Sequence, residues 1–264
     1  MNARARLLAF FAGLGSLLAS AAEIRRPSAV AIAAASDLVF CLPALHAEFA
    51  KIEPRVALRV TTGSSGNFFA QITHGAPYDV FLSADLSYPR ALVAAGAAEE
   101  KSLVLYGVGR LVFWTKRADL DPATDLAALL RNPLLKKLAL ANPTHAPYGR
   151  AAREALTTLG VWSLAEPKLV LGDNIAQTAQ FVETGHADAG VIALSLVLGA
   201  PASRESGRWT EIPATLHQPL EQGAVLTTRG AANPAAARYL AFLRTPEARA
   251  LFERFGFRLP PAIP

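Results

Sequence analysis

Several features that define whole classes of proteins are scarce in this sequence of 264 residues. The chain has a single cysteine, Cys41, which excludes an intramolecular disulfide framework and a cysteine-rich zinc module. Charged residues make up only 18% of it, and its formal net charge of +5 is modest for this length. Because the basic residues are scattered and are not interleaved with aromatic ones, we expect no nucleic-acid partner.

Long apolar runs are also missing beyond the N-terminal segment. Residues 1–22 begin with the basic Arg4 and Arg6, continue with apolar residues and end in the small residues Ala19-Ser20-Ala21. This pattern is typical of a cleavable signal peptide, and its apolar core is shorter than the roughly 20 residues that span a bilayer. We expect a periplasmic protein that is exported and cut after Ala21 or Ala22; the alternative is a buried N-terminal helix.

Apolar sequence, by contrast, is plentiful, at 52% of the residues. It is arranged in short runs that suit buried strands, and these alternate with stretches that have helical spacing. The predicted strands are residues 29–34, 56–61, 80–82, 111–114, 138–141, 168–171, 190–193 and 224–228. Strands that alternate with helices predict an α/β architecture with largely parallel sheets.

The length of the chain suits two domains, yet no linker divides it into halves. The C-terminal part adds two helices, which begin at Asn233-Pro234 and at Thr245-Pro246-Glu247, where threonine is a good N-cap and proline suits the first helical position. We therefore predict two interwoven α/β lobes, with the chain crossing between them more than once. Cys41 lies in an apolar helical stretch and is expected in the core.

Small polar residues join a predicted strand directly to a helix at four places. These loops are residues 33–37, 61–67, 141–149 and 171–175. In an open α/β sheet such loops gather at the carboxyl ends of the strands, where ligands bind. Each helix start offers unpaired N–H groups and the positive end of a dipole, so converging loops form a site for an anion. A simpler interpretation is that the serines only cap helices. That interpretation would explain a single loop of this kind, but it explains four such loops in one chain less well than an anion site does.

Other chemistries fit these residues less well. The segment 63–67 lacks the last glycine of the G-x-S-x-G turn that presents a serine nucleophile, because Asn67 stands there. The five histidines show no metal-ligand spacing, and His145, in the third loop, is either a ligand contact or a turn residue. An exported enzyme that acts on a phosphate or sulfate ester in the same cleft stays open as an alternative, although the loops contain no convincing general base.

Five segments spread over most of the chain carry a family resemblance. They are AAASDL (33–38), GSSGNFFAQITHGAPYDVFLSAD (63–85), APYGRAAREAL (146–156), GDNIAQTAQFVETGHADAGVI (172–192) and FERFGF (252–257). In these segments the sequence resembles the periplasmic molybdate-binding proteins of ABC transporters. The resemblance implies a type II periplasmic-binding-protein fold that closes on a tetrahedral oxyanion and delivers it to a membrane permease.

The resemblance also implies which residues bind the oxyanion. Ser36 and Ser65 would donate from hydroxyl and backbone, whereas Tyr148 and Ile175 would contribute backbone N–H groups. From its position beside Ser36, Asp37 is expected to contribute its backbone N–H as well. No residue is expected to act in catalysis or to bind the metal atom directly. Some members of the family have a ligand-binding tyrosine at the position of Ala193, and the phenol of Tyr148 is a candidate to replace that donor.

We therefore predict a monomeric binding protein for molybdate and tungstate, without a cofactor. Lobe one would comprise residues 28–106 and 223–264, and lobe two residues 107–222. The two connections, at 106–110 and 220–224, would form the hinge. A binding protein for sulfate or phosphate is the alternative within the same class.

Overall fold

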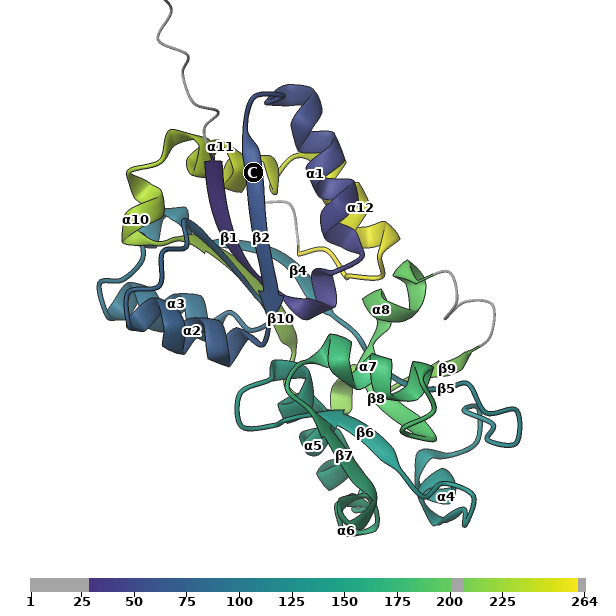
Figure 1. Ribbon diagram of the computed structural model, residues 1–264. Helices are drawn as coiled ribbons and strands as arrows, with labels where there is room; N and C mark the ends of the chain where they lie inside the picture. Colours follow the sequence, from purple (N-terminus) through teal and green to yellow (C-terminus); the bar gives the residue numbers. More distant parts are fainter. Residues whose placement is uncertain (1–28, 201–206, 261–264) are drawn as a thin grey trace, which may run out of the picture.

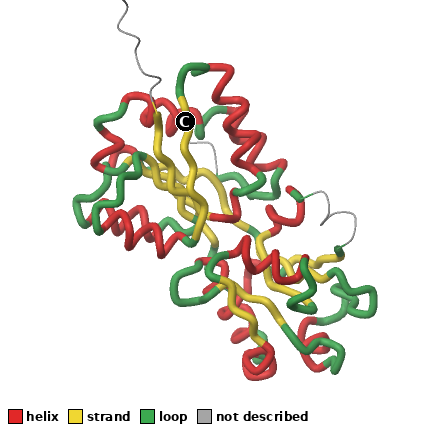
Figure 2. Tube along the Cα trace, viewed as in Figure 1, coloured by secondary structure: helices red, strands yellow, loops and turns green. Residues whose placement is uncertain are grey.

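Two lobes, each built on its own five-stranded sheet, make up the part of the chain that the computed structural model describes (Figure 1). That part is residues 29–200 and 207–260, so the predicted signal peptide at 1–22 lies outside the described residues. Helices flank the strands in both lobes, which confirms the predicted α/β architecture (Figure 2). Within the described ranges no helix is both long enough and apolar enough to cross a membrane.

The first sheet has the strand order β2-β1-β3-β10-β4. Its strands are β1 (Ala29–Ala35), β2 (Ala57–Gly63), β3 (Val80–Ser83), β4 (Val104–Gly109) and β10 (Leu220–Leu226). Around it lie α1 (Cys41–Ile52), α2 (Ser65–Thr73), α3 (Ser87–Ala94), α10 (Thr228–Ala231), α11 (Pro234–Phe242) and α12 (Pro246–Arg254), with the short 3-10 turns η1 (Ser36–Leu38) and η2 (Glu100–Ser102).

Both faces of this first sheet are covered, which explains why β1 is an uninterrupted apolar run. Ile32 packs in a cluster with α1, α11 and α12, whereas the next residue, Ala33, packs in a cluster with α2 and α3. Because successive strand residues point to opposite faces, a strand covered on both sides has no position for a polar side chain. Cys41 is buried in the first of these clusters, as predicted.

The second sheet has the strand order β7-β6-β8-β5-β9. Its strands are β5 (Leu111–Thr115), β6 (Leu138–Ala141), β7 (Leu169–Gly172), β8 (Ala189–Ala193) and β9 (Arg208–Glu211). Its helices are α4 (Leu126–Arg131), α5 (Pro147–Thr158), α6 (Trp162–Ala165), α7 (Ile175–Glu183) and α8 (Leu194–Gly199), with the 3-10 turns η3 (Glu166–Lys168) and η4 (Ala214–Leu216).

Each sheet contains one strand that runs against its neighbours. In the first lobe β10 is antiparallel to β3 and β4, and in the second β5 is antiparallel to β8 and β9. These are the strands with which the chain enters a lobe after crossing from the other one. The parallel strands end at the lobe boundary, so a strand that starts there has to run in the opposite direction. The sheets are therefore mixed, where the sequence predicts largely parallel ones.

The predicted strands are all present, with ends that differ by a few residues, and two further strands were not predicted. These are β4 and β9, which lie at the edges of their sheets. The helix that follows Thr245 is present as α12, and the Thr245 hydroxyl caps it by accepting a hydrogen bond from the Ala248 N–H. The helix predicted after Asn233 is present as α11, and it is capped by the Asn233 side chain.

The chain crosses between the sheets at two places. The first crossing is a single residue, Arg110, between the end of β4 at Gly109 and the start of β5 at Leu111. The second leads from β9 through η4 into β10, which starts at Leu220. The two crossings lie side by side, since Leu220 pairs with Gly109 in the first sheet. The lobe boundaries proposed from the sequence, 106/107 and 222/223, fall within β4 and β10.

Candidate functional site

A pocket with an empty volume of about 200 Å³, open solvent at its mouth included, lies between the two lobes. Segments of both lobes line it, and they come from all four polar loops that the sequence singles out. Its lining residues are Ala35, Ser36, Asp37, Gly63, Ser64, Ser65, Ala84, Ala146, Pro147, Tyr148 and Ile175. All five predicted site residues are thus brought together in one place.

Three helices of at least nine residues begin at this pocket. Ser65 is the first residue of α2, and Ile175 is the first residue of α7, whose N-cap Asn174 accepts a hydrogen bond from Gln177 N–H. In α5 the first residue is Pro147, which has no N–H, so Tyr148 carries the first N–H of that helix. The first N–H groups of a helix have no partner within it, so the N–H groups of Ser65, Tyr148 and Ile175 are available to an anion in the pocket.

Two buried serine hydroxyls add side-chain donors. Ser65 Oγ accepts a hydrogen bond from the backbone N–H of Ala84 at 3.0 Å. Ser36 Oγ accepts one from the N–H of Ala176, in the other lobe, at 3.4 Å. Because both oxygens act as acceptors in these bonds, each hydroxyl keeps its own proton for a ligand.

The carboxyl group of Asp37 lies in a hydrogen-bond network that joins the two lobes. Its Oδ2 accepts from the Tyr148 hydroxyl at 3.0 Å and from Gln222 Nε2 at 2.6 Å. The Tyr106 hydroxyl in turn donates to Gln222 Oε1 at 2.8 Å. Burial raises the pKa of Asp37 from 3.8 to about 6, while the hydrogen bonds from Gln222 and Tyr148 act in the opposite direction. The phenol proton of Tyr148 is therefore used within the protein.

No arginine, lysine or histidine belongs to the pocket lining within the described residues. Arg150, which follows the third loop, instead forms an ion pair with Asp85 and donates to the Tyr88 hydroxyl at 2.8 Å. The pocket therefore offers an anion neutral donors and helix termini, and its only ionisable groups are Asp37 and the phenol of Tyr148.

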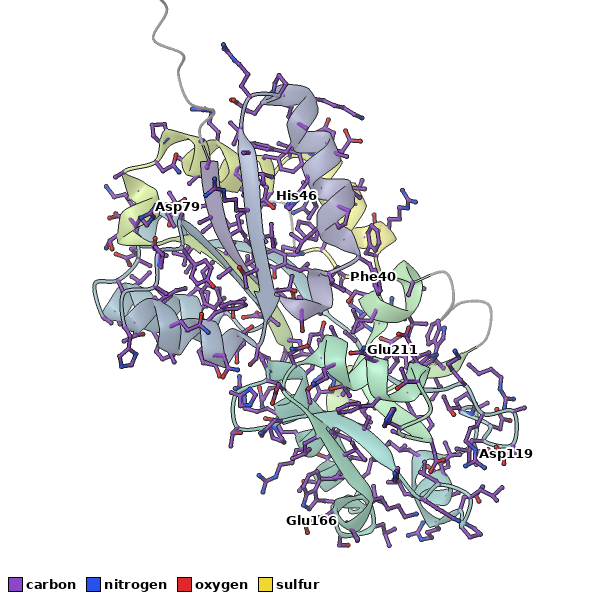
Figure 3. The ribbon with its side chains drawn as sticks, in the orientation of Figure 1. Phe40, His46, Asp79, Asp119, Glu166 and Glu211 are labelled. Carbon is purple, nitrogen blue, oxygen red and sulfur yellow. The ribbon has the colours of Figure 1, made fainter. Side chains whose placement is uncertain are left out.

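Direct contacts between the lobes surround the pocket. Ser64 Oγ and the Gly66 N–H both donate to the backbone carbonyl of His145, at 2.5 and 3.0 Å, and Ser195 Oγ donates to the carbonyl of Asp37 at 2.8 Å. Glu211 of the second lobe, which lies near the boundary between the lobes (Figure 3), forms an ion pair with Arg258 of the first. The two lobes are thus closed around the pocket.

Sequence analysis missed three residues of this site. Gln222 and Tyr106 hold the Asp37 network, and Ser195 bonds the Asp37 backbone, but all three lie far from Asp37 along the chain. No local pattern marks them, because strands and helices that are distant in sequence bring them to the lobe boundary. Among the described residues, no group of three or more His, Cys, Asp and Glu side chains is placed to hold a metal ion.

Comparison with known proteins identifies the family. A model of the family described as "Bacterial extracellular solute-binding protein" matches residues 30–258. The molybdate-binding protein ModA of Rhodobacter capsulatus is 44% identical over 195 residues, which cover 74% of this chain and 75% of the relative. ModA of Azotobacter vinelandii is 35% identical over 253 residues, 96% of each chain. The chain belongs to the ModA family.

Solved structures agree with this assignment to the ModA family. The periplasmic molybdate-binding protein of Azotobacter vinelandii superposes with a TM-score of 0.81 at 32% identity, over 88% of this chain and 99% of that one. The sulfate-binding protein SubI of Mycobacterium tuberculosis has a TM-score of 0.72 at 13% identity, over 89% and 88% of the two chains, which shows a shared fold. The predicted periplasmic-binding-protein fold and the prediction of a binding protein rather than an enzyme are both confirmed.

Proposed function

We propose that this chain captures molybdate in the pocket between its lobes and delivers it to the membrane permease of an ABC transporter. The observation that carries the proposal is the convergence of three helix starts and two buried serine hydroxyls on one pocket without a cation. The names of the relatives in Rhodobacter and Azotobacter support molybdate as the ligand. The metal atom would be carried within the oxyanion, held through its oxygens, and no cofactor is needed.

We propose that the pocket selects molybdate over sulfate by the size of the anion. Molybdate and sulfate are both dianionic tetrahedra, so the charge of the pocket does not distinguish them. The longer metal–oxygen bonds of molybdate suit donors that are placed too far apart to satisfy a smaller ion at the same time. Tungstate has nearly the same size and shape as molybdate, and we propose it as a second ligand. Sulfate and phosphate are the alternatives that this argument disfavours.

We propose that Ser36, Asp37, Ser65, Tyr148 and Ile175 bind the oxyanion. Tyr148 would act through its backbone N–H, since its hydroxyl donates to Asp37 and leaves no second proton for the ligand. Ala193, buried at the end of β8, has no donor to offer from its side chain. The phenol of Tyr148 is therefore proposed to position Asp37 rather than to replace the tyrosine that some family members have at the position of Ala193.

The proposed working cycle is a change between open and closed lobes. Because the ligand would touch residues of both lobes, it favours the closed form through the contacts that exist only there. Residues 28–106 with 223–264, and 107–222, are proposed to move as the two bodies, with the paired segments 106–110 and 220–224 of β4 and β10 as the hinge. We propose that the closed protein acts as an exported monomer and is the form that the permease recognises.

Calorimetric titration of residues 23–264 with molybdate, tungstate, sulfate and phosphate at one salt concentration tests the proposal. Strong binding of the first two ions without heat from the others supports it. Binding of sulfate or phosphate alone would agree with the fold but would change the proposed ligand. No heat of binding from any of the four ions would refute the anion site. Small-angle scattering with and without ligand tests closure, since a protein that does not become more compact contradicts the cycle.

A further inference from the structure

A buried carboxyl group inside an anion pocket calls for an explanation. Asp37 is 1% exposed and lines the pocket together with the neutral donors described above. Its Oδ2 accepts two hydrogen bonds, but its Oδ1 is buried without a partner among the described residues. A buried carboxylate oxygen without a partner makes the charged form costly, and Oδ1 is the atom that is free to take up a proton.

Among the residues that the structure describes, no cation acts on Asp37 to hold it ionised. The elements packed around Asp37 supply neutral groups. Tyr148 from α5, Gln222 from β10 and Ser195 from α8 form hydrogen bonds with it. Tyr106 from β4 and Cys41 from α1 lie near it, and Ile175 and Gly63 line the same pocket. Burial raises the pKa of Tyr106 and Tyr148 well above 10, and it raises that of Cys41 too, so all three are neutral at pH 7.

We propose that the proton is a co-ligand of this pocket: when the oxyanion binds, Asp37 takes up one proton. The inference rests on the proposed function, because it needs an anion in the pocket. A dianion beside an ionised Asp37 would place three negative charges in one pocket, with no cationic side chain among its described lining residues. Protonation removes one of them, and the carboxyl group keeps its hydrogen bonds from Gln222 and Tyr148 through Oδ2.

The sign of the pH dependence follows from two states of Asp37. In the closed lobes without a ligand the pKa of Asp37 is about 6, so most molecules carry an ionised Asp37 at pH 8. A bound dianion raises that pKa further, because a neighbouring negative charge disfavours the ionised form. Between the two values each binding event takes up close to one proton, and the dissociation constant rises about tenfold per pH unit. Below pH 6 the uptake declines, because the free protein already holds the proton.

Calorimetry with sodium molybdate measures this uptake directly. Titrations at pH 8 in two buffers that differ in ionisation enthalpy give the number of protons bound per molybdate. We expect close to one proton for the wild-type protein, and a dissociation constant about tenfold weaker at pH 8.5 than at pH 7.5. Asp37→Asn, which keeps the size of the side chain and cannot ionise, should bind without proton uptake and with the same affinity at both pH values.

A matched control uses a carboxylate on a neighbouring loop. Asp173 is exposed to solvent, so Asp173→Asn should retain both the affinity and the proton uptake of the wild type. His145 is the nearest histidine along the polar loops, and uptake that is lost in His145→Gln but kept in Asp37→Asn would overturn the inference. If Asp37→Asn does not fold, the lack of proton uptake in the wild type, or its loss in His145→Gln, still overturns the inference.

The outcomes separate the two proposals. Molybdate binding without proton uptake at pH 8 overturns the role of Asp37 and leaves the proposed function standing. No binding at any pH overturns the proposed function and this inference with it. Uptake of one proton that disappears only in Asp37→Asn supports both.

Discussion

The Ser64 hydroxyl, in the first lobe, donates a hydrogen bond to the backbone carbonyl of His145, in the second lobe, at 2.5 Å. The same carbonyl accepts a second bond from the N–H of Gly66 at 3.0 Å. One carbonyl oxygen of the third polar loop thus holds the start of α2 against the other lobe. The lobes can meet this closely only because Gly66 has no side chain.

Gly66→Ala should weaken ligand binding while leaving the fold intact. A Cβ atom at this position would lie 2.6 Å from the His145 carbonyl oxygen, so the closed lobes would have to move apart. A clash of this kind costs about 1–3 kcal/mol, or roughly 5- to 150-fold in affinity. Calorimetry measures the loss, and scattering should show a more open protein at saturating ligand.

The open form should tolerate this alanine, because Gly66 lies in a helix, where alanine is favoured by about 1 kcal/mol. The Tyr88 hydroxyl, which a Cβ would meet at 2.8 Å within the same lobe, is the end of a side chain that can shift. The unliganded variant should therefore melt no lower than the wild type. Asn67→Ala, one residue later and exposed to solvent, is the control and should bind normally. A Gly66→Ala protein with unchanged affinity would show that this contact does not limit closure.

Ser65→Ala should weaken molybdate binding by about 1–3 kcal/mol, because it removes a buried donor to a charged ligand. Ser65 is 1% exposed, and its oxygen is oriented by the Ala84 N–H. Ser87→Ala, at the start of α3, removes a hydroxyl that is not part of the pocket lining and serves as the control. Equal dissociation constants for Ser65→Ala and the wild type would remove Ser65 from the site.

Asp37→Asn should make the unliganded protein more stable at pH 8. The pKa of Asp37 is raised in the folded protein, from 3.8 to about 6. The stabilisation linked to its proton is therefore complete below pH 4 and is lost as the pH rises through 6. A difference of about two pKa units corresponds to about 3 kcal/mol at most.

Urea unfolding at pH 8 and at pH 5 measures this effect. The gain from Asp37→Asn should shrink between the first pH and the second, while Asp173→Asn should show no comparable change. A variant that is destabilised by the same amount at both pH values would contradict a raised pKa at Asp37.

The fold was largely predictable from local pattern, and the exceptions have physical reasons. Buried strands such as β1 are marked by unbroken apolar runs because both of their faces are covered. The strand β9 is short, lies at an edge and contains charged residues, and the glycines of β4 resemble those of a loop. Strand direction depends on where the chain crosses between the lobes, so no local pattern predicted that β5 and β10 are antiparallel.

The part of the candidate site that depends on local sequence was also predictable, whereas the contacts between distant residues were not. The serines and helix starts of the polar loops are local signals, because strand, turn and helix follow one another in the sequence. The network around Asp37 could not be predicted, because it depends on Gln222, which is 185 residues away along the chain. The use of the Tyr148 phenol also could not be predicted, because its partner is in the other lobe.

Asp79→Ala should destabilise the first lobe without changing ligand affinity. Asp79 is 3% exposed and immediately precedes β3, at the end of the sheet away from the pocket (Figure 3). Its carboxylate accepts from the Ala31 N–H at 2.8 Å and from Arg229 Nε at 3.0 Å. Loss of this acceptor leaves the half-buried Ala31 N–H unpaired, which costs about 1–3 kcal/mol.

The free energy of unfolding in urea and a molybdate titration measure the two effects of Asp79→Ala. Asp121→Ala, whose side chain is 62% exposed, should change neither. An Asp79→Ala protein as stable as the wild type would show that another group takes over the Ala31 N–H.

The position of β10 in the first sheet determines when that lobe can be completed. β10 lies between β3 and β4, although it follows both of them by more than a hundred residues, and β4 pairs with no other named strand. All strands of the second sheet, by contrast, lie between Leu111 and Glu211. During synthesis the second sheet therefore has all of its strands before the first one does. Until β10 has been synthesised, the first sheet lacks the strand between β3 and β4, and β4 has no strand with which to pair.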